Sequence, residues 1–160
     1  MTPDPRPRVL VIDDEASNLE TFQRVFRRDL RIELCASGRE ALSVLRQREF
    51  DAILVDYSMP GMNGAQLLQA AAELQPETVR MMVTAHADLD EVRGLKASGM
   101  VNRTIIKPWD RDHLLQWIQN AARITAMRRA LPPEGAGAST SPAPPAGTTG
   151  PGPTGRKPSG

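Results

Sequence analysis

The chain has 160 residues, of which 40% are hydrophobic, and this length allows one ordinary core but not two large domains. Its formal net charge is +1, so no strong field favours nucleic acid or an anionic membrane. Cys35 is the single cysteine, which excludes an internal disulfide and is typical of a reducing compartment. No apolar stretch precedes Val9, and no apolar run approaches the roughly 20 residues that span a bilayer. We therefore expect a soluble, cytoplasmic protein with no membrane insertion and no direct nucleic-acid contact.

The segment 132–160 differs in composition from the rest of the chain. It holds eight of the 14 prolines and seven of the 12 glycines, and it lacks Val, Ile, Leu, Met and aromatic residues. Such a segment buries too little apolar surface to offset the entropy of ordering, so its composition predicts a disordered tail. The sequence therefore divides into an N-terminal extension at 1–7, a folded domain at 8–131 and a disordered tail at 132–160.

Short apolar runs alternate with amphipathic stretches along the predicted domain. The first run, 9–12, is short and rich in β-branched residues, which is typical of a strand rather than a buried helix. Apolar residues then recur at helical spacing from Leu19 to Phe26, and Ser17 and Glu20 have the spacing of a capping box. The pattern therefore predicts a strand followed directly by a helix.

The same alternation continues to the end of the domain. The later predicted elements are, in chain order, a strand at 32–34, a helix opening at Gly38, a strand at 52–55, a helix at 65–74 ended by Pro76, a strand at 79–83, a helix from Asp88 through Lys96 ended by Gly99, a strand at 101–106 stopped by Pro108, and an amphipathic helix starting at Asp110. Five strand–helix units in succession predict an α/β domain, with a parallel sheet covered by helices on both faces.

Four of the predicted strands end in residues that carry a charge or a hydroxyl. The first is followed by Asp13 and Asp14, the third by Asp56, the fourth by Thr84 and the fifth by Lys107. In a doubly wound sheet the carboxyl ends of the strands meet at one edge, where the functional crevice lies. Three carboxylates held close repel one another unless a cation joins them, and Mg²⁺ suits an open site with oxygen ligands.

This set of residues has the chemistry that phosphoryl transfer requires. An aspartate can act as the nucleophile and form an acyl phosphate. A metal ion and a lysine neutralise charge on the transferring oxygens, and a hydroxyl can hydrogen-bond one of them. Each residue type is common at strand ends, but the coincidence of all of them at successive strand ends favours a phosphoryl site.

The segments VLVIDDE, ILVDYSMPGMNG, VTAHAD and IIKPW closely resemble, in combination, the receiver domain of bacterial two-component response regulators. The resemblance covers about residues 8–130 and implies a flavodoxin-like fold, a doubly wound five-stranded parallel sheet of order 2-1-3-4-5. It also implies a response regulator of a phosphorelay, which accepts a phosphoryl group from a sensor histidine kinase or a phosphotransfer protein.

The resemblance assigns a role to each residue of this edge of the sheet. Asp56 is implied to be the phosphoacceptor, and Thr84 and Lys107 the residues that assist the transfer. The metal ligands are implied to be Asp13, Asp14, Asp56 and the backbone carbonyl of Ser58. The bond between Lys107 and Pro108 is usually cis in this family, which aims the lysine side chain inward.

Two positions depart from the usual pattern of the family. Receivers often carry Tyr or Phe three residues before the lysine, a ring that turns inward on activation, but this chain has Thr104. Thr104 is too small to fill that space, and its hydroxyl can instead bond a nearby backbone group. We therefore expect a smaller or less cooperative change on the face formed by 88–97, 101–106 and 110–122. His86 stands two residues after Thr84, at a position that influences the lifetime of the phosphate in the family, and is equally well read as a solvated loop residue. Signalling to a downstream protein target is expected through the face formed by 88–122.

Two other functions remain open at this stage. The first is a receiver that acts as a scaffold without being phosphorylated, which the missing aromatic residue favours. The second is an aspartate-nucleophile phosphatase, but that chemistry requires an Asp-x-Asp pair and a cap domain, whereas Asp13 and Asp14 are adjacent. The stretch VNRTIIKPWD resembles receivers that precede output domains, yet no output domain follows, so a stand-alone receiver is expected. Apart from its own phosphorylation and dephosphorylation, no enzymatic activity is expected.

Overall fold

The computed structural model describes residues 4–57, 64–86 and 89–131. The chain divides into two units, 1–129 and 130–160, and the sheet belongs to the first. The predicted tail, 132–160, and the predicted metal ligand Ser58 lie outside the described residues, so both remain predictions. Among the helices that are described, none is long and apolar enough to cross a membrane.

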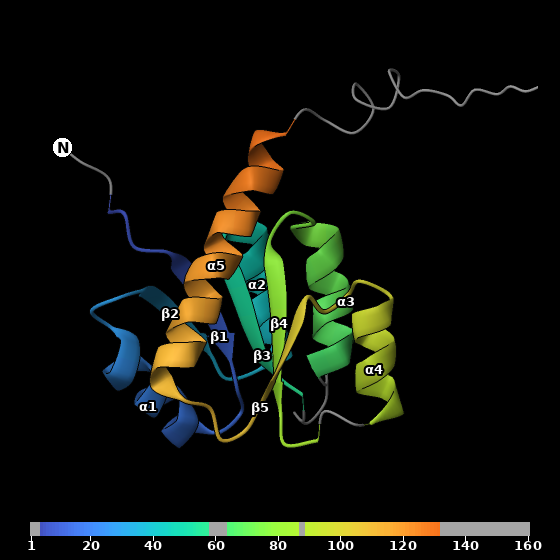
Figure 1. The fold of residues 1–160 in the computed structure, drawn as a ribbon, viewed down its shortest axis with the longest axis horizontal. Helices are drawn as coiled ribbons and strands as arrows, with labels where there is room; N and C mark the ends of the chain where they lie inside the picture. Colours follow the sequence, from blue (N-terminus) through green and yellow to red (C-terminus); the bar gives the residue numbers. More distant parts are fainter. Residues whose placement is uncertain (1–3, 58–63, 87–88, 132–160) are drawn as a thin grey trace, which may run out of the picture. The chain divides into compact units, whose positions relative to one another are not determined.

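Five strands and five helices alternate along the described part of the chain (Figure 1). The strands are β1 (Arg8–Ile12), β2 (Arg31–Cys35), β3 (Ala52–Asp56), β4 (Val79–Thr84) and β5 (Arg103–Ile106). The helices are α1 (Ala16–Phe26), α2 (Gly38–Gln47), α3 (Gly64–Leu74), α4 (Asp90–Ala97) and α5 (Arg111–Ala130). All strand pairs are parallel, and the order is β2-β1-β3-β4-β5. The predicted flavodoxin-like doubly wound sheet is therefore confirmed.

Alternate residues of the central strands enter two separate cores, one on each face of the sheet. Val9 and Val11 of β1 pack in the core that α1 and α5 complete. Leu10 and Ile12 of the same strand pack in the core that α2, α3 and α4 complete. Because helices cover both faces, the runs 9–12 of β1 and 52–55 of β3 are apolar without alternation. Replacing one such residue by Ala, for example Leu54 of β3, would cost about 2–5 kcal/mol of unfolding free energy.

The start of α1 differs from the prediction. The helix begins at Ala16 and its N-cap is Glu15, whose side chain makes no capping hydrogen bond. Ser17 therefore lies inside the helix, and the predicted capping box is wrong. Capping of that kind occurs instead at α2, where the Ser37 hydroxyl accepts a 3.1 Å hydrogen bond from the Glu40 backbone N–H.

Other element ends differ from the prediction by one or two residues, as terminal turns commonly do. β4 ends at Thr84 and β5 begins at Arg103. α4 begins at Asp90, while the predicted cap Asp88 lies outside the described residues. Gly99 follows α4 with φ of 85°, a left-handed conformation that glycine adopts without strain. Its predicted role in ending the helix is confirmed.

Polar side chains at the amino ends of the strands are buried and hydrogen-bonded to the backbone. The Gln75 amide nitrogen donates to the carbonyl oxygens of Leu45 and Arg48 at 2.9 and 2.6 Å. Its amide oxygen accepts from the Phe50 backbone N–H at 3.1 Å. The hydroxyl of Thr125 in α5 accepts from the first N–H of β4 at 3.0 Å. These bonds connect α2, α3, α5 and the sheet at the end opposite to the acidic residues.

Candidate functional site

The carboxyl ends of the strands bring together the five side chains that the sequence predicts to form a site. Asp13 and Asp14 follow β1, Asp56 ends β3, Thr84 ends β4, and Lys107 follows β5. One carboxylate oxygen from each of the three aspartates lies within 4.8 Å of the others. Asp13 and Asp56 are almost fully buried, with 9% and 8% of their surface exposed. Three acidic groups at this spacing can hold a divalent cation through oxygen ligands.

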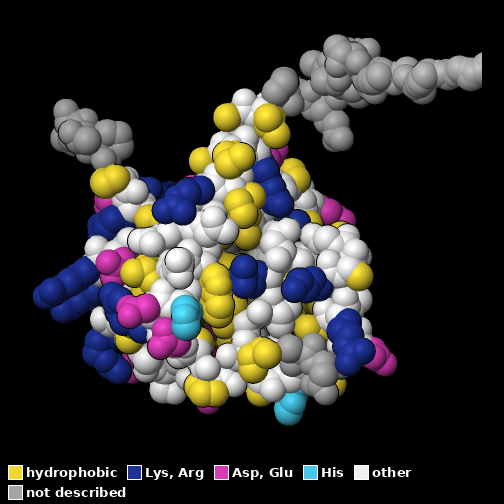
Figure 2. Space-filling model, in the orientation of Figure 1, with side chains coloured by type: hydrophobic (Ala, Val, Ile, Leu, Met, Phe, Trp, Pro, Cys, Tyr) yellow, Lys and Arg dark blue, Asp and Glu magenta, His cyan; other side chains and the backbone are white. Residues whose placement is uncertain are grey.

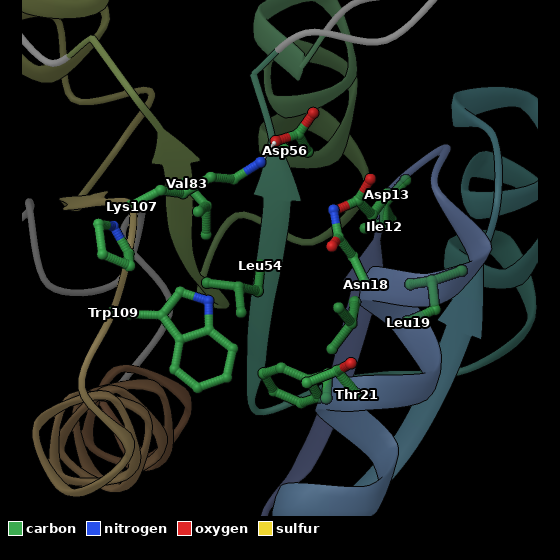
Figure 3. Close-up of a pocket in the computed structure, with 13 residues that line it drawn as sticks. Ile12, Asp13, Asn18, Leu19, Thr21, Leu54, Asp56, Val83, Lys107 and Trp109 are labelled. Carbon is green, nitrogen blue, oxygen red and sulfur yellow. Dashed lines mark hydrogen bonds and ion pairs between the residues drawn. The ribbon is translucent and has the colours of Figure 1, made fainter.

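Lys107 is the cation that contacts this acidic cluster directly. Its Nζ lies 2.8 Å from Oδ1 of Asp56, and Figure 3 shows the two side chains pointing toward each other. The backbone N–H of Lys107 donates to the carbonyl oxygen of Thr84 at 2.9 Å, which fixes the loop after β5 to the end of β4. The peptide bond between Lys107 and Pro108 is cis, in agreement with the family resemblance.

Asp13 is oriented by two hydrogen bonds from the start of α1. Its Oδ1 accepts from the backbone N–H of Glu15 at 2.9 Å. Its Oδ2 accepts from the side-chain amide of Asn18 at 3.0 Å, and the two groups lie side by side in Figure 3. Sequence reasoning missed Asn18. Asn18 follows Asp13 by five residues, and this spacing predicts a contact only if the first helix begins before Asn18. The helix begins at Ala16, so the condition is met.

Gly64, at the start of α3, allows the helix to approach the end of β3 closely. A Cβ atom at this position would lie 2.5 Å from the carbonyl oxygen of Asp56 and 2.9 Å from the Cα of Tyr57. Both distances are too short for non-bonded atoms, so no side chain fits. The Gly64 N–H donates to the Tyr57 carbonyl at 2.9 Å, which holds the approach in place. Sequence reasoning missed this constraint, because glycine is common near loops for its backbone freedom alone.

The hydroxyl of Thr84 and the nearby His86 lie at the same site. Thr84 is buried, and its Oγ1 accepts from the backbone N–H of His86 at 3.0 Å. A cavity of about 400 Å³ is lined by these two residues together with Asp14, Asp56 and Lys107, among others. This hollow is large enough to hold a phosphoryl group with several water molecules.

The electrostatic environment of the cluster opposes the ionised form of Asp56. Burial is the largest cause that raises the pKa of Asp56, and the charges of Asp13 and Asp14 add to it, while Lys107 opposes the rise. Partial burial alone would lower the pKa of Lys107. The hydrogen bond from Lys107 to Asp56 and the nearby carboxylates outweigh burial, so the pKa of Lys107 is raised. One lysine therefore neutralises only part of the acidic charge.

Thr104 does not make the hydrogen bond that the sequence suggests. Its side-chain Oγ1 is buried, and within the described part of the chain it has no hydrogen-bond partner. That expectation is therefore wrong for this structure. A different contact links the end of β3 to α4, because the Tyr57 hydroxyl donates to the carboxylate of Glu91. The sequence gives no signal for this pair, which lies 34 residues apart.

The face predicted to carry the output signal includes β5 and α5, which Figure 2 shows toward the viewer. Hydrophobic side chains are mixed there with Lys and Arg. Ile106 is 56% exposed, and the Arg103 guanidinium stacks 4.9 Å from the ring centroid of Trp117. His113 stacks on the same ring. Both charged and apolar groups are thus available to a partner, but docking at this face stays a prediction.

The chain belongs to the response regulator receiver domain family, whose pattern it matches over residues 9–119. Receiver domains are signalling modules of two-component systems, in agreement with the family that the sequence motifs indicate. The chain is 29% identical to the hydrogenase transcriptional regulatory protein HoxA of Cupriavidus necator. That match covers 78% of this chain but only 26% of HoxA, so the chain spans about a quarter of the length of this relative.

Solved structures support the same assignment. A CheY-like receiver domain protein from Methanospirillum hungatei has 25% identity and a TM-score of 0.71, over 77% of this chain and 98% of that one. A structure described as adenylate cyclase from Rhodopirellula baltica has 30% identity and a TM-score of 0.74, over 78% of this chain and 93% of that one. The fold is therefore shared by proteins whose names indicate different outputs.

Proposed function

We propose that this receiver works by phosphorylation of Asp56, with a phosphohistidine of a sensor kinase or phosphotransfer protein as donor. The observation that carries the proposal is the position of the Lys107 ammonium, 2.8 Å from the carboxylate of Asp56 inside a cluster of three acidic groups. A purely structural ion pair needs one carboxylate for each ammonium. The two extra carboxylates are costly without a cation, and their presence supports a site built for a charged reactant.

The transfer follows from this geometry. One carboxylate oxygen of Asp56 attacks the phosphorus atom, and the new P–O bond forms as the P–N bond to the donor imidazole breaks. The imidazole leaves with the electron pair and takes a proton from solvent. Lys107 then moves from the Asp56 carboxylate to an oxygen of the phosphoryl group, and Thr84 donates its hydroxyl hydrogen to another oxygen.

The acidic residues fit Mg²⁺, which the family resemblance implies. Asp13 and Asp14 would hold the ion together with Asp56 and the backbone carbonyl of Ser58. When bound, Mg²⁺ neutralises charge on the transferring oxygens. The hydrogen bonds from Glu15 and Asn18 fix both oxygens of Asp13, so this ligand is already oriented before the ion arrives.

The signal would leave through the segment after β4. A phosphoryl group adds about −1.5 to −2 charges and strong acceptor oxygens beside Thr84. Movement of Thr84 toward the phosphoryl group would pull the backbone of His86, which donates to its hydroxyl. α4 follows this segment in the chain. Glu91, in the first turn of α4, accepts a hydrogen bond from the Tyr57 hydroxyl. A downstream protein that docks on the 88–122 face would sense the change.

The proposal is tested by intact-mass analysis after incubation with acetyl phosphate and Mg²⁺. We expect one added phosphoryl group in the wild-type chain and none in Asp56→Asn. Asp112→Asn serves as the matched control, because its carboxylate is exposed and belongs to another part of the fold. Labelling of Asp56→Asn at the wild-type rate would refute the assignment of the phosphoacceptor.

A scaffold that is never phosphorylated is the second candidate, and the observation that favours it is the buried hydroxyl of Thr104, which has no hydrogen-bond partner among the described residues. Such a position lacks the aromatic ring of the usual switch, so the chain lacks one part of the usual response to phosphorylation. Amide hydrogen exchange with beryllofluoride and Mg²⁺ separates the two functions. Saturable binding of beryllofluoride with slower exchange in α4 and β5 supports the phosphorylated switch, whereas the absence of saturable binding supports the scaffold.

A further inference from the structure

A second and larger cavity extends from the acidic cluster toward α1. Its volume is about 500 Å³, and it lies between α1, the central strands and the loop that follows β5 (Figure 3). The charged groups stand at one end in this view, and Thr21 and Trp109 at the other. The size falls within the range of about 300–1,000 Å³ that is usual for small-molecule sites. The phosphoryl group needs only the smaller hollow around Thr84, so the apolar part of this cavity has no role in the proposed transfer.

The walls of this cavity are mainly apolar and partly aromatic. Leu19 and Phe22 of α1, Leu54 of β3 and Val83 of β4 line it, and Trp109 closes it from the side of α5. The Trp109 ring packs edge-on against Phe22 with 6.3 Å between the ring centroids. Such a wall offers a flat ring of a ligand both apolar contact and edge-to-face packing.

The polar end of the cavity carries an excess of negative charge. Asp13, Asp56 and Lys107 line it. The Lys107 ammonium is already paired with Asp56, and the third carboxylate, Asp14, lies beside the other two. A molecule whose apolar part fills the cavity would therefore present its other end to a net negative group. Charge complementarity favours a cationic end and disfavours an anionic one.

We propose that this cavity binds small amphipathic organic cations, namely primary amines that carry an aromatic ring. The ring packs against Phe22, Leu54 and Trp109, and the ammonium contacts Asp13 and Asp56. The ammonium then occupies the position that a metal ion between these carboxylates needs, so amine and Mg²⁺ exclude each other. Binding of the amine does not depend on whether Asp56 accepts a phosphoryl group, so the two proposals can fail separately.

Two tryptophans provide an internal control for a binding measurement. Trp109 lines the cavity, whereas Trp117 lies on the outer side of α5 with Arg103 and His113. We titrate ¹⁵N-labelled protein with tryptamine in the absence of Mg²⁺ and follow the two indole N–H signals by NMR. A saturable shift of the Trp109 signal, with the Trp117 signal unchanged, is expected. No saturable shift, or equal shifts of both signals, would overturn the proposal.

Two probes separate the contribution of charge from that of the ring. Indole-3-propionate carries a similar ring with an anionic end, and methylammonium carries the charge without the ring. Each is expected to bind at least about tenfold more weakly than tryptamine, which corresponds to roughly 1.4 kcal/mol. Addition of Mg²⁺ should raise the apparent Kd of tryptamine as its concentration increases. Equal affinity for the anionic probe, or a Kd that Mg²⁺ leaves unchanged, contradicts the proposed position of the ammonium.

Substitutions on α1 complete the test. Thr21 lines the cavity, so Thr21→Phe is expected to fill it and to weaken tryptamine binding at least about tenfold. Gln23 lies on the exposed side of the same helix, and Gln23→Phe should bind as the wild type does. Equal binding by both variants would place the ligand elsewhere. If Thr21→Phe does not fold, the titrations of the wild-type chain with Mg²⁺ and with the anionic probe still decide the proposal.

Discussion

Buried polar groups at the two ends of the sheet differ in how far neighbouring residues pair or neutralise them. At the amino end, Gln75 is 6% exposed and its amide group makes hydrogen bonds with Leu45, Arg48 and Phe50. At the carboxyl end, oxygen atoms of three carboxylates lie within 4.8 Å of one another. The Lys107 ammonium contacts one of these carboxylates, that of Asp56. The amide group of Gln75 is satisfied by the fold itself, whereas the three neighbouring carboxylates at the carboxyl end carry more negative charge than the single ammonium of Lys107 neutralises.

This difference separates stability from function in physical terms. Buried groups that are fully hydrogen-bonded contribute to stability, and removing one of them leaves its partners unpaired. A cluster of like charges lowers stability in the absence of a cation, and it persists because a ligand uses it. Changes at the amino end should therefore lower stability, and removal of a carboxylate at the other end should raise it. Substitutions at the two ends test this contrast, from the largest expected effect to the smallest.

Gln75→Ala should have the largest effect on stability. The substitution leaves the carbonyl oxygens of Leu45 and Arg48 and the N–H of Phe50 without their present partner in a buried position. Each unpaired group costs about 1–3 kcal/mol, so a loss on the order of 3 kcal/mol in unfolding free energy is expected. Urea unfolding measures it. Gln69→Ala, at an exposed position of α3, the helix that ends just before Gln75, is the matched control and should change stability by less than about 0.5 kcal/mol.

Gly64→Ala should lower stability as well, although Gly64 belongs to the functional end. Its Cβ would lie 2.5 Å from the Asp56 carbonyl oxygen, so α3 must move away from β3. A cost of about 1–3 kcal/mol is expected, together with slower phosphorylation because the backbone of Asp56 shifts.

Gly94 provides the control for this substitution. Apart from the backbone of α4 itself, no atom of the described residues lies within 4 Å of a Cβ placed there, and Gly94 is in the interior of α4. Gly94→Ala should raise stability by roughly 0.5–1 kcal/mol through helix propensity. If the two variants had the same unfolding free energy, the close approach of α3 to β3 would not constrain the site.

Asp56→Asn should raise the stability of the metal-free protein at pH 7. Burial and the charges of Asp13 and Asp14 raise the pKa of Asp56, so the folded state binds this proton more tightly than the unfolded chain does. The contribution of Asp56 is then most favourable below the ordinary Asp pKa of about 3.9, and it is lost as the pH rises through the raised folded pKa. We expect a melting temperature roughly 2–5 °C higher at pH 7, with the difference shrinking toward pH 3.

Asp112→Asn is again the control, because its exposed carboxylate should leave the melting temperature nearly unchanged at both pH values. A lower melting temperature for Asp56→Asn at pH 7 would mean that the ion pair with Lys107 outweighs burial and repulsion. The functional end would then resemble the amino end, and the contrast between them would be wrong.

The parallel sheet and its acidic edge could be predicted from the residue pattern and the strand order from the family resemblance, whereas the contacts that position the site could not. Apolar blocks such as 9–12 and 52–55 identify strands buried on both faces, and the residues that follow them must meet at one edge. Helix starts depend on competing local bonds. Asp13 accepts from the N–H of Glu15 and α1 begins at the next residue, so Ser17 is already helical and cannot cap.

Contacts between distant segments account for the remaining omissions. Gln75 bonds to residues 25 to 30 positions earlier, and Tyr57 to Glu91 across 34 positions. No regular spacing in the sequence predicts either of these contacts. The need for glycine at position 64 also could not be predicted from neighbouring residues. It arises because the backbone at the end of β3 passes close to this position.

Removal of residues 132–160 should have the smallest effect. The segment contains no Val, Ile, Leu, Met or aromatic residue, so it offers neither apolar surface for the two cores nor a large anchor for the sheet. A chain truncated after Leu131 should melt within about 1 °C of the full chain and accept a phosphoryl group at the same rate. Thermal unfolding and intact-mass analysis with acetyl phosphate measure both properties. A fall of several degrees would show that the segment packs on the domain, and slower labelling at unchanged stability would show that it acts on the acidic end alone.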